Sequence, residues 1–137
     1  MKRGRGVAPV HDDAGIEEAI RAESRESAGG LIILPDAFNE AHRDVIIAAA
    51  ARSSLPLIGA PTFPKAGGLM SYWFDIFSDP YIHGASYIDR ILRGASPADL
   101  PVQRPTKFSL IINLKTAKAL GLTVPPSMLD LADEVIE

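Results

Sequence analysis

The sequence predicts an α/β domain whose sheet is mostly parallel and flanked by helices. Short apolar runs typical of buried strands alternate along the chain with segments whose apolar residues recur at helical spacing. The length of 137 residues fits a single domain. Hydrophobic residues make up 47% of the chain and charged residues 23%, so the composition is that of a globular protein and not of a disordered one.

Helices are predicted where apolar residues repeat every three or four positions between capping residues and glycine stops. The first begins at Asp12 or Asp13, since carboxylates favour the positive end of a helix, and it ends before Gly29. The remaining helices are expected over 39–52, 80–93, 115–120 and from Pro125 to Ile136. In the helix over 80–93, five residues are expected to face inward: Tyr81, Ala85, Ile88, Ile91 and Leu92.

Strands are predicted where short apolar runs are bounded by glycine, proline or polar residues. They cover residues 31–34, 55–59, 69–72 and 108–112. The run Leu31 to Leu34 is continuous and branched, which favours a strand buried on both faces. Residues 60–68 are rich in proline and glycine and are expected to form a loop, and residues 1–11 a loose N-terminal arm before a single domain over 12–137.

Composition and charge exclude several classes of protein. The chain has no cysteine, which excludes disulfide scaffolds, ordinary zinc fingers and thiol catalysis. Its net charge of −3 gives no support to nucleic-acid binding. The apolar run over 6–10 is too short for a secretory signal, and no run reaches the length of a membrane span. As written, the chain is therefore expected to be cytoplasmic.

No catalytic motif is present, and we expect no enzyme, no cofactor and no metal site. The sequence has no P-loop, no GxGxxG, no GxSxG and no HExxH. The three histidines, His11, His42 and His83, lie far apart with no ligand spacing, so we interpret each as a surface or structural residue.

Asp36 is the first candidate binding residue. It follows the predicted strand 31–34 after Pro35, which places it at the carboxyl end of a parallel strand, where ligands bind in open α/β sheets. A carboxylate there can hold an ammonium group or a hydroxyl. The alternative is that Asp36 caps the next helix, because Asp is a favoured N-cap residue.

The second candidate is the segment from Ala66 to Tyr72. Its two glycines permit close backbone approach, and Ser71 and Tyr72 then supply hydroxyls and an aromatic face, a mixture that suits a small-molecule site. Phe63, in the preceding loop, is counted with them as a candidate ligand contact. The alternative is a tight turn into a core strand. Aromatic residues follow the strand, and we expect them in the core, or on a partner surface if exposed: Trp73, Phe74 and Phe77.

Several stretches of the chain resemble one family in order and spacing. They are Gly67-Gly68-Leu69-Met70-Ser71-Tyr72, Tyr87-Ile88-Asp89-Arg90-Ile91-Leu92-Arg93-Gly94-Ala95, Pro97-Ala98-Asp99-Leu100-Pro101-Val102 and Ile112-Asn113-Leu114-Lys115-Thr116-Ala117-Lys118-Ala119-Leu120-Gly121-Leu122-Thr123-Val124-Pro125-Pro126. The chain resembles the substrate-binding proteins of ABC transporters, of the type I periplasmic-binding-protein-like kind whose ligands include tryptophan and tyrosine. The resemblance covers residues 66–136 most closely and 12–65 more loosely.

The resemblance implies two α/β lobes joined by a hinge, with a small amino-acid-like solute between them and no catalysis. It places Asp36 where the family has an acidic residue that meets a ligand amine, and Ser71 and Tyr72 in the cleft segment near the hinge. The sequence departs from the family at Trp73, where a glycine is usual, and a tryptophan there could fill the cleft.

The resemblance also implies a truncated form, because family members are longer and carry an export signal that places them in the periplasm. Residues 12–72 are expected to form part of the second lobe, and residues 73–137 the segment that returns to complete the first. Exposed apolar faces would then favour a homodimer with exchanged segments. A permease is expected as partner only for a full-length exported form. The alternatives are a cytoplasmic homo-oligomer without ligand or transport role and, ranked last, a small α/β enzyme.

Overall fold

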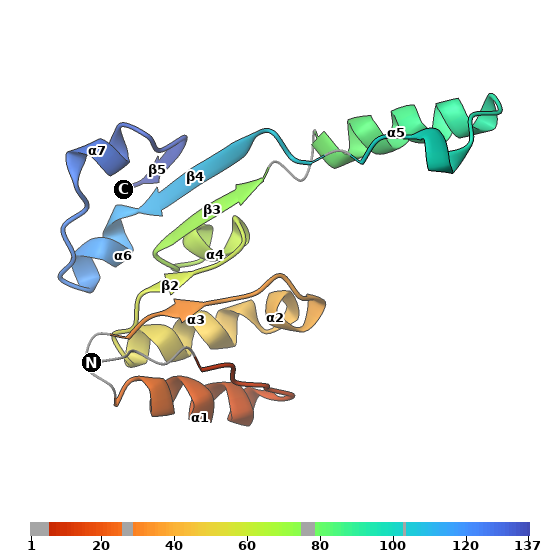
Figure 1. Cartoon of the computed structure of the whole chain (residues 1–137). Coiled ribbons are helices and arrows are strands. Elements are labelled where there is room, and N and C mark those ends of the chain that lie inside the picture. The colour runs from red at the N-terminus through yellow and green to blue at the C-terminus, as the bar shows by residue number, and fades with distance from the viewer. Residues whose placement is uncertain (1–5, 26–28, 75–78, 103) are drawn as a thin grey trace.

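The computed structural model describes residues 6–25, 29–74, 79–102 and 104–137, which form one five-stranded sheet with helices around it (Figure 1). The strands are β1 (Leu31–Ile32), β2 (Leu57–Ile58), β3 (Met70–Phe74), β4 (Phe108–Asn113) and β5 (Glu134–Ile136). The helices are α1 (Asp13–Glu23), α2 (Ala37–Ala41), α3 (Arg43–Arg52), α4 (Thr62–Lys65), α5 (Asp79–Leu92), the 3-10 turn η1 (Pro97–Asp99), α6 (Leu114–Ala119) and α7 (Pro126–Leu129).

The sheet confirms the predicted fold class. Its strands follow the chain in the order β1-β2-β3-β4-β5. The first three strands are parallel, β4 runs antiparallel to β3, and β5 is parallel to β4. Parallel neighbours need crossover connections, and here α2 and α3 connect β1 to β2 while α4 connects β2 to β3.

The first helix forms as predicted and anchors the core. The Asp12 carboxylate accepts a hydrogen bond from the Gly15 N–H at 2.7 Å, which caps α1. Ile16 and Ile20 are buried against α3. The core cluster also contains the following buried residues: Ile46, Ala49, Ala50, Leu55, Leu57 and Phe63. Val10 packs against this cluster, so residue 10 is not part of a loose arm, and residues 1–5 lie outside the described residues.

The helix predicted over 39–52 is two helices. It begins earlier, at Ala37, and is interrupted at His42, whose backbone (φ −101°, ψ 16°) is not helical. The His42 ring stacks on Phe38 with centroids 4.0 Å apart, and its Nδ1 lies 2.8 Å from the Phe38 carbonyl oxygen. The sequence did not predict this break, because neither glycine nor proline marks it and the helical periodicity continues across it. Residues 60–68, expected as a loop, also contain α4.

The predicted C-terminal helix is wrong beyond its first turn. Only α7 is helical, and Glu134–Ile136 form β5. The strand is held by β4: the Leu110 N–H donates to the Asp133 carboxylate at 2.8 Å, and the Asp133 N–H donates to the Leu110 carbonyl at 2.9 Å. The β-branched pair Val135 and Ile136 suits a strand, and long-range pairing overrides the helical spacing.

One face of the sheet is apolar and largely uncovered, although Ile112 on the same side is 1% exposed. This corrects the expectation that residues 31–34 are buried on both sides. Leu31, Ile33 and Leu57 belong to the packed face and contact the core cluster. The register places alternate residues of β1 to β4 on the other side. We call the exposed members of that side the open face: Ile32 (76% exposed), Leu34 (64%), Ile58 (37%), Tyr72 (63%) and Phe108 (45%).

Residues 79–102, which we call the arm, leave the body of the molecule. Figure 1 shows α5 pointing away from the sheet, and the chain returning along it to β4. Ile88, Ile91 and Leu92, expected to face inward, are exposed, and the side chain of Tyr81 lies outside the described residues. The return is fixed by a hydrogen bond from the Tyr87 hydroxyl to the Pro101 carbonyl.

The return segment therefore divides into two parts. The arm leaves the sheet, whereas β4 and β5 extend the same sheet that holds β1 to β3. The antiparallel pairing of β4 with β3 along its length holds β4 in this sheet. That residues 73–137 complete another lobe stays a prediction.

Candidate functional site

Asp36 lies at the carboxyl end of β1, as predicted, and it caps α2. Its Oδ1 accepts a hydrogen bond from the Phe38 N–H at 2.7 Å, which is the alternative role proposed from the sequence. Its side chain is exposed, and within the described part of the chain Oδ2 has no partner. One oxygen is therefore committed to the cap while the other faces solvent with its charge available.

A second polar group joins the loops that follow β1 and β2. The Glu40 carboxylate accepts from the Thr62 hydroxyl at 3.0 Å and from Arg43 Nη1 at 3.2 Å. The bond to Thr62 ties α2 to α4 at the same edge of the sheet where Asp36 lies. Glu40 and Thr62 were not predicted as site residues, although Thr62 closely follows the predicted strand 55–59.

Ser71 and Tyr72 lie on opposite faces of β3, because successive side chains of a strand alternate. Ser71 is fully buried, and its hydroxyl has no hydrogen-bond partner within the described residues. Tyr72 is 63% exposed on the open face. These two residues therefore do not form one wall of a site in this structure.

Tyr72 has an aromatic partner that the sequence analysis did not single out. Its ring stacks on Phe108 of β4, with centroids 5.4 Å apart and planes inclined by 13°. The two rings together form a flat apolar surface on the β3–β4 side of the open face. The signal for Phe108 was absent from the sequence, since only the antiparallel register of β3 and β4 brings the two residues together.

Phe63 packs in the core and is 2% exposed. Its neighbours are glycines for a steric reason: a Cβ at Gly59 would lie 2.8 Å from the Phe63 ring, and one at Gly68 would lie 3.0 Å from the Phe63 carbonyl oxygen. Trp73, the departure from the family pattern, is half-buried and stacks on Phe74 with centroids 5.6 Å apart. Phe77 lies outside the described residues.

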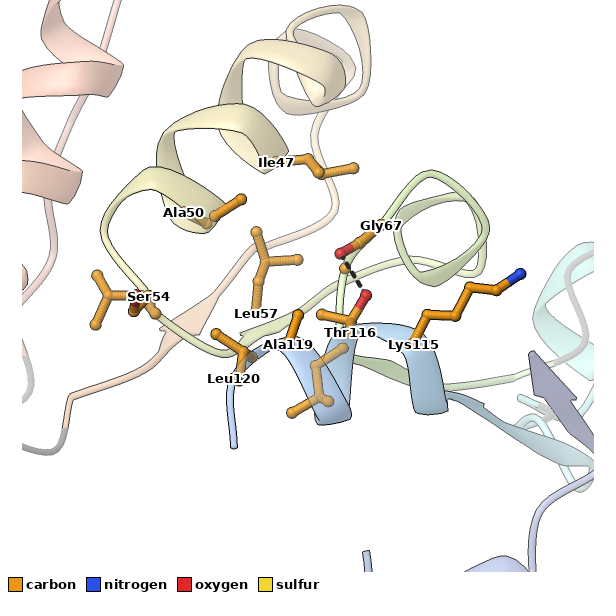
Figure 2. A pocket seen from close by; sticks show the side chains of 13 residues that line it. Ile47, Ala50, Ser54, Leu57, Gly67, Lys115, Thr116, Ala119 and Leu120 are labelled. Carbon is orange, nitrogen blue, oxygen red and sulfur yellow. Dashed lines mark hydrogen bonds between the residues drawn. The ribbon is translucent and has the colours of Figure 1, made fainter. Parts of the chain in front are cut away.

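A pocket of about 300 Å³ lies elsewhere, between α3 and α6 (Figure 2). Its walls include Ile47, Ala50 and Leu57 on one side and Ala119 and Leu120 on the other. At its rim the Thr116 hydroxyl donates to the Gly67 carbonyl at 2.9 Å. None of the four predicted site residues lines it.

The described residues include neither a metal-binding cluster nor a helix that could span a membrane. No group of three or more His, Asp or Glu side chains is placed to hold a metal ion. No helix among them is long and apolar enough to cross a membrane. His42 contacts Phe38 and lies 3.6 Å from Asp13, while the side chain of His83 lies outside the described residues.

Solved structures share this fold. A conserved domain protein from Vibrio cholerae O1 biovar El Tor is 28% identical with a TM-score of 0.76, over 90% of this chain and 41% of that one. An ABC domain in complex with L-Trp from Streptococcus pneumoniae is 26% identical with a TM-score of 0.79, over 93% of this chain and 43% of that one.

A ligand-free, open substrate binding protein with adhesive properties from Clostridium difficile is 20% identical with a TM-score of 0.64, over 93% of this chain and 42% of that one, and it shares the fold alone. The chain thus spans about two fifths of the length of these structures. No curated protein matches it. The family model for the ABC transporter substrate binding protein matches residues 7–136, almost the whole chain, and the chain therefore belongs to that family.

Proposed function

We propose that this chain forms one wall of a solute-binding site in an ABC-type importer and binds a small amino-acid-like solute without catalysis. The observation that carries the proposal is the placement of Asp36, whose uncommitted carboxylate oxygen is exposed at the carboxyl edge of parallel strands. Tyr72 adds an exposed aromatic surface two strands away, about 10 Å across the sheet. A negative charge and an aromatic surface match the ammonium group and the side chain of an aromatic amino acid.

Family membership and one relative support the choice of solute. The relative from Streptococcus pneumoniae was solved in complex with L-Trp. In the proposal, the carboxylate of Asp36 meets the ammonium group of the solute, and the stacked Tyr72 and Phe108 rings meet its side chain. Delivery to a membrane permease is the role that follows for the whole transporter.

A single wall should bind weakly. Binding pockets bury most of a ligand's surface, and a surface open on one side loses much of that contact. We expect a dissociation constant for L-Trp on the order of 1 mM or weaker. NMR titration of the monomeric chain with L-Trp should shift amide signals around Asp36 and Tyr72. Submicromolar affinity, or shifts confined to the pocket between α3 and α6, would contradict the proposal.

The variant that tests the carboxylate is Asp36→Asn. An asparagine oxygen can still accept from the Phe38 N–H, so the cap on α2 is kept while the negative charge is lost. We expect the shifts caused by L-Trp to fall several-fold while the spectrum of the unliganded protein is unchanged. Glu18→Gln removes an exposed charge from α1 and serves as the matched control, for which L-Trp binding should not change.

The alternative function, a homo-oligomer that binds no solute and has no transport role, is favoured by one observation. Tyr72 and Phe108, the residues proposed to meet the solute, belong to an apolar face large enough to pack against another protein surface. If L-Trp causes no shifts of the amide signals, this alternative replaces solute binding.

A further inference from the structure

We propose that two copies of this chain exchange arms, so that α5 of each copy covers the open face of the other. The proposal does not rest on solute binding. In such a dimer the partner's arm covers Tyr72 and Phe108, so solute binding at these two rings is expected only in the monomer. The evidence for the exchange is the surface area of the chain, the chemistry of two exposed apolar surfaces, and the length of α5.

The accessible surface of the chain exceeds that of a compact protein of the same mass. It amounts to 9737 Å², whereas a compact protein of 14.7 kDa exposes about 6,900 Å². The difference, about 2,800 Å² per chain, reaches the area that each subunit of an obligate dimer buries, about 1,000–2,500 Å². A second copy can therefore account for the surface that this chain leaves open.

The two surfaces that would be buried are both apolar and both unpartnered in the chain. The open face presents five large apolar side chains from four neighbouring strands. On α5, Ile88, Ile91 and Leu92 recur at positions i, i+3 and i+4, so they share one side of the helix. Asp89 forms an ion pair with Arg93, just past the end of the same helix, at 2.9 Å.

The helix α5 is long enough to reach across the open face. A helix of 14 residues is about 21 Å long. The four strands of the open face are separated by three spacings, which together measure about 14 Å. One α5 helix can therefore cross all four strands.

The point where the arm leaves the sheet favours exchange over folding back. The arm follows β3, and Tyr72 on the open face lies only two residues before the end of that strand. Within its own chain α5 extends away from the sheet, as Figure 1 shows. A two-fold axis near this edge would lay each arm across the partner's sheet, and such exchange of identical elements is a low-cost route to a dimer.

The first test is the mass of the 137-residue chain in solution, measured by light scattering after size exclusion. We expect a dimer, with twice the mass of 14.7 kDa. Ile91→Glu on α5 and Ile32→Glu on the open face should each give a monomer with an unchanged circular dichroism spectrum, because both side chains are exposed within the chain. Leu131→Glu, at an exposed position outside both surfaces, is the control and should remain dimeric.

A second test detects the exchange itself. The chain has no cysteine, so an engineered pair is the only possible disulfide. Ile91→Cys and Ile58→Cys proteins, made separately, mixed and oxidised, should give a mixed disulfide dimer in preference to either self-pair.

Three outcomes would overturn the proposal. They are a monomeric wild-type chain, a dimer that Ile32→Glu dissociates but Ile91→Glu does not, and the absence of the mixed disulfide. The L-Trp titration is run on the Ile91→Glu monomer, whose open face is uncovered, so loss of the dimer and loss of solute binding can be told apart.

Discussion

The two faces of the sheet are built from similar apolar residues, but one is buried within the chain and the other is largely exposed. On the packed face, Leu57 lies against the core cluster and is 2% exposed. One residue further along β2, on the open face, Ile58 is 37% exposed. Helices cover the first face within the chain, whereas the arm, which carries apolar residues of its own, leaves the second uncovered. Apolar residues along a strand therefore indicate that a face of the sheet packs against something. They do not identify the element that covers it.

The largest expected change in the free energy of unfolding is for the removal of an aromatic side chain from the core. The matching variant on the open face should change it much less. Phe63→Ala should lower the free energy of unfolding by about 3–5 kcal/mol, because Phe63 is 2% exposed and its removal leaves a cavity. Phe108→Ala should cost about 1 kcal/mol, since Phe108 is 45% exposed and loses chiefly its stacking on Tyr72.

Both variants are to be measured by urea denaturation in the Ile91→Glu background, where the chain is expected to be monomeric. This background keeps the partner's arm from burying Phe108. Equal losses for the two variants would show that the open face is packed in solution, and the contrast between the faces would then fail.

Glycine substitutions compare the body with the arm at a smaller scale. Gly59→Ala would place its Cβ 2.8 Å from the Phe63 ring, so we expect a loss of about 1–3 kcal/mol from overpacking. Gly84→Ala on α5 meets nothing within 4 Å, and it should raise the helicity of the arm by removing a poor helix former. Urea denaturation measures the loss of stability expected for Gly59→Ala, and circular dichroism measures the gain of helicity expected for Gly84→Ala. A destabilised Gly84→Ala protein would show that the arm is packed against other residues near that position.

The sequence predicted the elements whose stability is local and missed those that depend on distant partners. The fold class and α1 with its Asp12 cap were predictable from periodicity and capping chemistry. The strand β5 was not, because Val135 and Ile136 fit a helical repeat and only their pairing with β4 makes them a strand. The break at His42 was missed for a related reason, since the residues on both sides of it favour helix.

The candidate site shows the same division. Asp36 could be placed at the carboxyl end of a strand, and even its cap role was foreseen, because both follow from neighbours in sequence. Whether Ser71 and Tyr72 share a wall depends on strand alternation, and it could have been questioned from the sequence alone. The stacking of Tyr72 on Phe108 could not, because the two residues lie 36 positions apart and meet only through the β3–β4 register.

The smallest predicted effect concerns the end of α3, on the packed side of the molecule. Ser54 has a φ of 51°, in the left-handed region that favours glycine, and the Leu55 N–H donates to the Ala50 carbonyl at 3.0 Å, as in a Schellman motif. Ser54→Gly should therefore raise the free energy of unfolding by about 0.5 kcal/mol, since relief of strain exceeds the added freedom of the unfolded chain.

Ser53→Gly is the matched control for this variant, because Ser53 has a φ of −94° and gains nothing from glycine. It should lower the free energy of unfolding by about 0.5–1 kcal/mol. Urea denaturation of the two neighbouring variants should thus give changes of opposite sign. Changes of the same sign would show that the left-handed conformation at Ser54 is not what ends α3, and that the packing of Leu55 into the core fixes the turn instead.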